Sequence, residues 1–242
     1  MTIEPNNDYN PSPKYSRRHQ LEQILPRLSR EQLEHFLLET ALRDLELRET
    51  LLIHFGEYLN TSDPEEAKYR ATLQRMIARH QNTTGFINLE SAQKLSDMLE
   101  SLLESARQAT TPPSKTIDLC MAMIGIMPTL GEHLDDSEGH IYRLMRITCV
   151  VLWECFSILP ADNQAVIFNR LLTEYANPVY LDLDLDSFML ALLKDLAKHN
   201  REWQRACLHQ QDQLLKEVKD DKWRKNYLLE QLNDLLGTWH KK

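Results

Sequence analysis

Glycine is scarce in this chain, with six residues among 242. Loops that hold phosphate groups need glycine, because their backbone amides must come close to the ligand, so we expect no phosphate-binding loop. The G-x-S-x-G and S-x-x-K patterns of hydrolase nucleophiles are also missing from the sequence. Helices are expected to take up nearly every residue, whereas catalytic side chains concentrate on loops. The sequence therefore predicts a protein that is not an enzyme.

The cysteines lack the C-x-x-C and C-x-C spacings of zinc-binding sites. They are Cys120, Cys149, Cys155 and Cys207, and three of them have apolar neighbours in the sequence. Reduced cysteine in such surroundings behaves as a small buried hydrophobe. A chain of this size does not need disulfides to hold its core, so we expect a reducing, cytoplasmic location.

The nine histidines include no H-E-x-x-H pattern. The densest set of possible metal ligands is His133, Asp135, Asp136 and His140. These residues straddle an Asp-Asp-Ser-Glu-Gly phrase, and such residues are typical of a turn between helices. We interpret the acids as part of a capping turn and expect no metal and no cofactor.

A second acidic phrase, Leu-Asp-Leu-Asp-Leu-Asp over residues 181–186, alternates as a strand would. It lacks the glycine turn that a calcium-binding loop requires. No partner strand is evident elsewhere in the chain, so we expect an extended connector that ends at a helix N-cap, either Asp186 or Ser187.

No hydrophobic run is long enough to cross a membrane, and residues 1–18 contain no apolar core of a secretory signal. With 42% hydrophobic and 26% charged residues, the composition is typical of a soluble globular protein without a membrane partner. The net charge of −8 argues against a general nucleic-acid binder, whose affinity depends on neutralising phosphates.

Apolar residues recur at helical spacing from about residue 21 to 239, which predicts an all-α protein. We expect about ten helices with short connections, arranged as an irregular antiparallel bundle or an α-solenoid. No strict sequence period supports a named repeat class. The expected organisation is a disordered or loosely docked arm over 1–17, a helical core domain over 18–177 and a C-terminal helical subdomain over 178–242.

Capping signals and apolar stripes give the expected helices more detail. Ser29 and Gln32 form a capping box, Asp63 and Pro64 begin another helix, and Asn88 caps a third. Pro128 is expected to kink or break the helix that contains it. The helix over 140–159 is apolar around most of its circumference and is expected to be central and buried. Residues expected to face inward include Phe36, Leu37, Leu42, Phe55, Leu144, Val150, Val166, Ile167, Leu171 and Tyr175.

The last third of the chain is richer in Gln, Lys and Asp and has a thinner apolar stripe. Its aromatic residues are candidates for a protein-binding surface, because tryptophan is enriched at binding hot spots, although each ring could equally close the core. The candidates are Trp203, Trp223, Tyr227 and Trp239. Alternatively, Lys222, Arg224 and Lys225 surround Trp223 and could bind single-stranded nucleic acid.

Four phrases carry a family resemblance. They are SREQLEHFLLETALRDLELRETLL, YRATLQRMI, GFINLESAQKLSDMLESLL and DDSEGHIYRLM. In this order, over residues 20–175, they resemble the helical region found beside SWIM-type zinc fingers in bacterial proteins. The finger itself, a C-x-C followed by C-x-H, is missing here. The resemblance implies an α-helical, repeat-like scaffold that works within a larger bacterial assembly, and it supplies no catalytic or zinc-binding residue.

Together these observations favour a non-enzymatic helical scaffold that binds another protein. The alternative is a nucleic-acid-associated subunit of a defence or processing complex, which would use the basic C-terminal helix.

Overall fold

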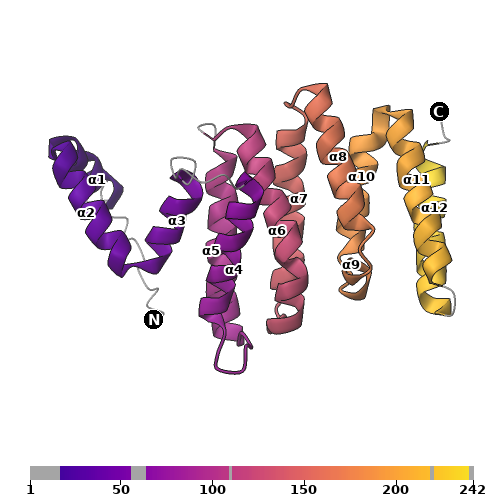
Figure 1. Ribbon diagram of the computed structural model, residues 1–242, viewed down its shortest axis with the longest axis horizontal. Coiled ribbons are helices and arrows are strands. Elements are labelled where there is room, and N and C mark those ends of the chain that lie inside the picture. Colours follow the sequence, from indigo (N-terminus) through magenta and orange to yellow (C-terminus); the bar gives the residue numbers. More distant parts are fainter. Residues whose placement is uncertain (1–16, 56–63, 109–110, 219–220, 240–242) are drawn as a thin grey trace, which may run out of the picture. The chain divides into compact units, whose positions relative to one another are not determined.

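The computed structural model describes residues 17–55, 64–108, 111–218 and 221–239. Over these ranges the chain forms twelve α-helices and two short 3₁₀ turns, with no β-strand beyond one isolated bridge (Figure 1). The expected all-α fold is confirmed. None of the described helices is long and apolar enough to span a membrane. The arm expected over 1–17 lies almost entirely outside the described ranges.

The chain divides into two compact units, residues 1–51 and 52–242, and the division falls inside one helix. The first unit contains α1 (Arg17–Ile24), a 3₁₀ turn η2 (Leu25–Arg27), α2 (Arg30–Arg43) and the first part of α3 (Leu45–Phe55). The expected boundary between residues 177 and 178 lies within the second unit, where helices on both sides of it contribute to one hydrophobic core.

In the first unit the predicted capping box is present. The Gln32 amide donates to Ser29 Oγ over 3.1 Å, and the Ser29 amide donates to Gln32 Oε1 over 2.8 Å. The expected inward face of α2 is wrong, since Phe36 is 63% exposed and Leu37 and Leu42 are exposed as well. A few short helices offer too little neighbouring surface to cover so wide an apolar face. Phe55, at the end of α3 and within the second unit, was also expected to face inward and is exposed.

The second unit is a succession of helices in which each packs on its near neighbours. Its first four helices are α4 (Glu65–His80), α5 (Leu89–Arg107), α6 (Pro113–His133) and α7 (His140–Phe156), with α6 against α4 and α7, and α5 against α7. They are followed by α8 (Ala161–Tyr175), α9 (Val179–Asp182), α10 (Asp186–Leu196), a 3₁₀ turn η4 (Ala197–His199), α11 (Arg201–Glu217) and α12 (Lys222–Trp239). Helix α10 packs against α7 and α8, and α11 packs against α8 and α12.

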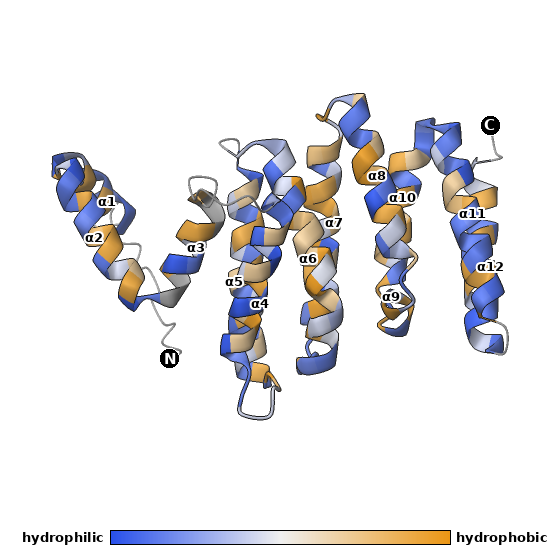
Figure 2. Ribbon diagram, viewed as in Figure 1, coloured by the Kyte–Doolittle hydropathy of each residue, from blue (hydrophilic) through white to orange (hydrophobic). Residues whose placement is uncertain are grey.

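Several of the expected helix signals can be checked in this unit. Asn88 caps α5 by accepting the Ser91 amide over 3.0 Å, as predicted. Pro64 occupies the N-cap of α4 rather than its first turn, and Asp63 lies outside the described residues. Val166, expected to face inward, is 58% exposed on α8. Helices α11 and α12 are visibly more hydrophilic than α6 and α7 (Figure 2), in line with the thinner apolar stripe of the last third.

Helix α6 lies at the centre of this unit and runs through Pro128 without a break. A proline has no amide proton, so Pro128 cannot donate to the carbonyl of Ile124, four residues earlier. The buried hydroxyl of Tyr180, on α9, lies 3.1 Å from that carbonyl oxygen and 3.2 Å from Glu174 Oε2 of α8, so its one proton is shared between these two acceptors. A side chain from another helix is therefore the donor closest at hand for the carbonyl that proline leaves without its usual partner.

The segment 181–186 is not the extended connector that its alternation predicts. Residues Val179–Asp182 form the single turn of α9, Asp184 has a left-handed φ of 55°, and α10 starts at Asp186. The side chain of Leu183 lies against α6 at Gly131, where an added Cβ would approach Leu183 Cδ2 to 2.7 Å. The leucines of this segment are packed against α6 and in the core, and no neighbouring strand is present among the described residues to pair with an extended backbone. The segment therefore forms a helical turn and a bend rather than a strand.

We predict that Tyr180→Phe will lower the free energy of unfolding by about 1–3 kcal/mol, because it leaves a buried carbonyl without a donor. The measurement is urea denaturation. Tyr142→Phe is the matched control, since the Tyr142 hydroxyl is an exposed group at 3.5 Å from the Leu183 carbonyl oxygen. Pro128→Ala restores an amide donor to Ile124, so the cost of Tyr180→Phe should shrink in that background. An equal cost in both backgrounds would disprove this role for Tyr180.

Candidate interaction surface

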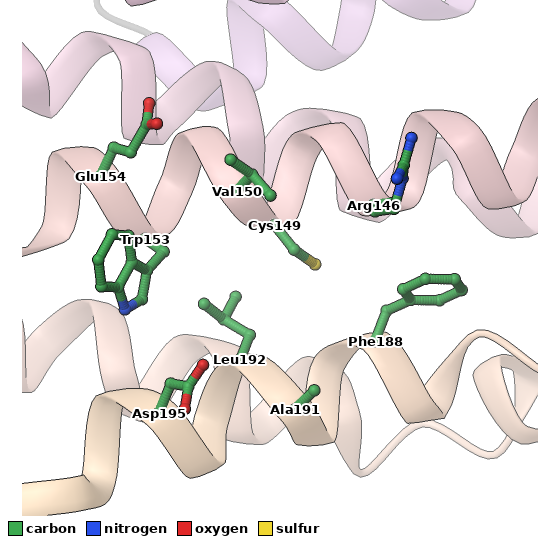
Figure 3. Close-up of a pocket in the computed structure, with 9 residues that line it drawn as sticks. All are labelled: Arg146, Cys149, Val150, Trp153, Glu154, Phe188, Ala191, Leu192 and Asp195. Atoms are coloured by element: carbon green, nitrogen blue, oxygen red, sulfur yellow. The ribbon is translucent and has the colours of Figure 1, made fainter.

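An apolar groove of about 450 Å³ lies between α7 and α10, within the second unit (Figure 3). It is open to solvent along one side and is formed by side chains from these two helices. The groove is the strongest candidate for a functional site, because exposed apolar hollows on a folded surface mark places where other molecules bind.

Helix α7 forms one wall with Arg146, Cys149, Val150 and Trp153, which follow the spacing i, i+3, i+4 and i+7 of one helical face. Val150 is 48% exposed and Trp153 is 49% exposed. The expectation that Val150 faces inward is therefore wrong. The opposite face of α7, which includes Leu144, is buried against neighbouring helices. The face that carries Val150 and Trp153 is the one that remains open to solvent.

Helix α10 forms the opposite wall with Phe188, Ala191, Leu192 and Asp195, again at i, i+3, i+4 and i+7. Phe188 is half-buried and makes an edge-to-face contact with Tyr142 of α7, with ring centroids 5.9 Å apart. This contact fixes one end of the groove. The two walls thus present matching stretches of about two helical turns each.

Cys149 lies at the bottom of the groove, with its sulfur directed toward the opposite wall (Figure 3). Burial raises the pKa of this thiol to about 12, because the apolar surroundings disfavour the charged thiolate. At neutral pH the group is a protonated thiol, which is neither a good nucleophile nor a good metal ligand. The groove therefore presents a surface for contact rather than a reactive group.

Charged side chains lie at the two ends of the groove (Figure 3). Glu154 is held in a two-pronged ion pair by Arg107 of α5, with both N–O distances at 2.6 Å. The side chains of Arg146 and Asp195 make no ion pair or hydrogen bond with any other described residue. One unpaired cation and one unpaired anion thus flank the apolar walls.

The candidate tryptophans from the sequence do not form one surface. Trp203 is half-buried on α11, where it stacks on Phe168 with ring centroids 4.5 Å apart and makes an edge contact with Phe156. It closes the core between α7, α8 and α11. Trp239 is half-buried against the same core, and its indole nitrogen is buried without a hydrogen-bond partner among the described residues.

Trp223 and Tyr227 do lie together on α12, as parallel rings with centroids 5.8 Å apart. Trp223 is 64% exposed, whereas Tyr227 is half-buried and donates its hydroxyl proton to Asp186 over 3.3 Å. Of the four aromatic candidates, Trp223 is thus the one whose ring is mostly available to a partner.

The three basic candidates on α12 differ in their surroundings. Arg224 is ion-paired with Asp182 of α9, and its Nε lies 3.5 Å from Asp221. Lys222 and Lys225 are exposed. The guanidinium of Arg224 is therefore already paired with carboxylates of this chain. The basic patch that remains consists of Lys222 and Lys225.

The acidic turn before α7 is made of capping interactions. Asp135 Oδ1 accepts the amide of Ser137 over 3.2 Å, and Asp136 Oδ1 accepts the amide of Ile141 over 2.9 Å. Over the described ranges, no group of three or more His, Cys, Asp or Glu side chains is arranged to hold a metal ion.

Asp186 begins α10 and is the centre of a buried polar network. Besides the bond from Tyr227, it accepts a hydrogen bond from Gln231 Nε2 of α12 over 2.7 Å. Gln211 of α11 donates to Gln231 Oε1 over 2.9 Å and accepts from Tyr175 of α8 over 2.5 Å. These bonds join α8, α10, α11 and α12. Burial raises the pKa of Asp186, although the hydrogen bonds from Gln231 and Tyr227 partly oppose the shift.

Comparison of the chain with protein-family models, with curated protein sequences and with solved structures yields no match. The resemblance to the helical region beside SWIM-type zinc fingers therefore depends on the quoted phrases alone and stays a prediction.

The sequence contained a signal for the groove. Residues 146–153 and 188–195 each carry apolar residues and one charge at the spacing i, i+3, i+4 and i+7. These two segments form the two walls of the groove. The same spacing describes a buried helical face, so periodicity alone does not separate an open wall from a core wall.

We predict that the stability of the protein depends on pH through Asp186. In the pH range between the ordinary aspartate pKa and the raised one, the folded chain holds a proton that the unfolded chain has lost. The free energy of unfolding therefore falls as pH rises through this range. Asp186→Asn removes this contribution. Between pH 4 and pH 7 the free energy of unfolding of the wild type should therefore fall relative to that of the variant, as measured by urea denaturation.

The control for this prediction is Glu230→Gln, an exposed position on α12. Its stability difference from the wild type should stay nearly constant over the same pH range. A constant difference for Asp186→Asn as well would show that Asp186 titrates alike in the folded and unfolded chains.

Proposed function

We propose that this chain is a non-enzymatic helical module that binds another protein, and that the groove between α7 and α10 is its contact surface. The observation that carries the proposal is the pair of half-exposed apolar side chains Val150 and Trp153 on a wall with helical spacing. An apolar centre with a charged rim is the usual anatomy of a protein–protein interface, and tryptophan is one of the residues enriched at hot spots.

The groove supports this proposal better than the C-terminal tryptophans do. Trp203 is occupied by ring contacts within its own unit, and only Trp223 is mostly exposed. The buried, protonated thiol of Cys149 supports a contact role over a catalytic one. The four cysteines are free and buried, which supports the expected reducing, cytoplasmic setting. Membership of a larger bacterial assembly is supported by the sequence resemblance alone.

Binding of single-stranded nucleic acid by α12 is the weaker candidate. The exposed Trp223, Lys222 and Lys225 favour it, but Arg224 is paired with acids of this chain and the net charge is −8. Such binding would weaken steeply as the salt concentration rises and would be lost in a Lys222→Ala/Lys225→Ala variant. Binding of a protein in the groove would survive high salt and would be unaffected by these two substitutions.

We predict that Val150→Glu will abolish partner binding, because it places a charge in the apolar centre of the groove. Trp153→Ala should weaken binding about 30-fold or more, the loss typical of a hot-spot tryptophan. The measurement is affinity purification from the native host at high salt, with each recovered protein quantified for every variant. A bound partner should come down in stoichiometric amount with the wild type and fall at least about tenfold with Val150→Glu.

Val166→Glu is the matched control, since Val166 is an exposed valine on α8 outside the groove. Both valine variants should keep wild-type thermal stability, because exposed substitutions usually change it little. The proposal fails if every recovered protein is captured equally by the Val150→Glu and Val166→Glu variants.

A further inference from the structure

The walls of the groove restrict the kind of segment that can occupy it. Both walls are α-helices, whose backbone amides and carbonyls are bonded within the helix. An added β-strand needs a free strand edge with unpaired backbone groups, and neither wall offers one. Binding must therefore use side-chain contacts, which is how a helix packs into the groove between two other helices.

The length of the groove matches about two turns of such a helix. Each wall extends from its first to its eighth position, which at 1.5 Å per residue is about 10 Å. A helix lying along α7 and α10 would thus contact the walls with apolar side chains at i, i+3, i+4 and i+7.

The unpaired charges add a second requirement. Arg146 lies at the end of the groove that Phe188 forms, and Asp195 lies at the end that Trp153 forms (Figure 3). Because the Glu154 carboxylate is already paired with Arg107, Asp195 is the carboxylate available to a partner at that end of the groove. An occupant that covers both ends leaves these charges poorly solvated unless it supplies an opposite charge to each.

We infer that the groove takes one amphipathic helix of a partner protein, with an apolar stripe of two turns that is flanked by an acidic residue at one end and a basic residue at the other. The acidic residue pairs with Arg146 and the basic residue with Asp195, so the order of these charges in the partner sets the direction in which its helix lies. The inference rests on the proposed function and deepens it.

The test uses three synthetic helical peptides that share one apolar stripe, with leucine at i, i+3, i+4 and i+7. Their flanking residues are lysine and glutamate, two lysines, or two glutamates. Binding to the full chain is measured by fluorescence anisotropy of labelled peptide. The lysine–glutamate peptide should bind the wild type about fivefold more tightly than either like-charged peptide, since two exposed ion pairs add modestly to affinity.

Two variants should change this preference. Arg146→Glu makes both ends of the groove acidic and should favour the two-lysine peptide. Asp195→Lys makes both ends basic and should favour the two-glutamate peptide. The controls are Arg205→Glu and Glu230→Lys, which make the same changes in net charge at exposed positions on α11 and α12 and should leave the wild-type preference in place.

The outcomes separate the inference from the proposed function. If no peptide binds, or if Val150→Glu leaves peptide binding unchanged, the groove is not a docking site and the proposed function fails with the inference. If binding depends on Val150 but the two charge variants keep the wild-type preference, only the inference is wrong. A wild-type dimer that dissociates on Val150→Glu would make a second copy of the chain the occupant and would also overturn the inference.

Discussion

Pro128 leaves the carbonyl of Ile124 without an amide donor in the middle of the buried helix α6, and the hydroxyl of Tyr180, which also contacts Glu174 Oε2, donates to it in place of the amide. Because an unsatisfied buried carbonyl costs about 1–3 kcal/mol, this bond ties α9 to a particular turn of α6. Gly131, one turn further along, leaves room for Leu183 to lie against the same helix. The short helix α9 is therefore attached to α6 at two points.

The attachment of α9 determines where α10 begins, since only a few residues separate them. Asp186, the first residue of α10, is in turn bonded to Tyr227 and Gln231 of α12. Arg224 of α12 is ion-paired with Asp182 at the end of α9. A segment of seven residues thus connects the central helix α6 to the last helix, and it positions α10 beside α7. Helix α10 also packs against α7 and α8, so these contacts and the segment together set the separation of the two groove walls.

Much of the fold was predictable from the sequence because its determinants are local. The Ser29 capping box, the Asn88 cap and the 3.6-residue periodicity are each decided by residues within one or two turns. The segment 181–186 was not predictable, because its alternation of Leu and Asp fits a strand equally well. The turn that it forms instead is accompanied by contacts with Gly131 and Gln231, which are distant in the sequence. The hydrogen bond of Tyr227 to Asp186 was not predictable for the same reason, since the two residues are distant in the sequence.

The groove was not predicted because apolar residues have the same helical spacing on an open groove wall and on a buried core face. Which of the two a helix face becomes depends on whether another helix packs against it. Val150 was expected to be buried, yet the helices that cover the inner face of α7 do not reach its outer face. The charges at the ends distinguish this groove from a poorly filled core. A core closed by the chain itself would bury Arg146 and Asp195 without partners, at a cost of several kcal/mol for each ion. Open to solvent, both charges remain hydrated until a molecule arrives that can replace the water, and only one with apolar and charged groups in the matching order can do so without loss.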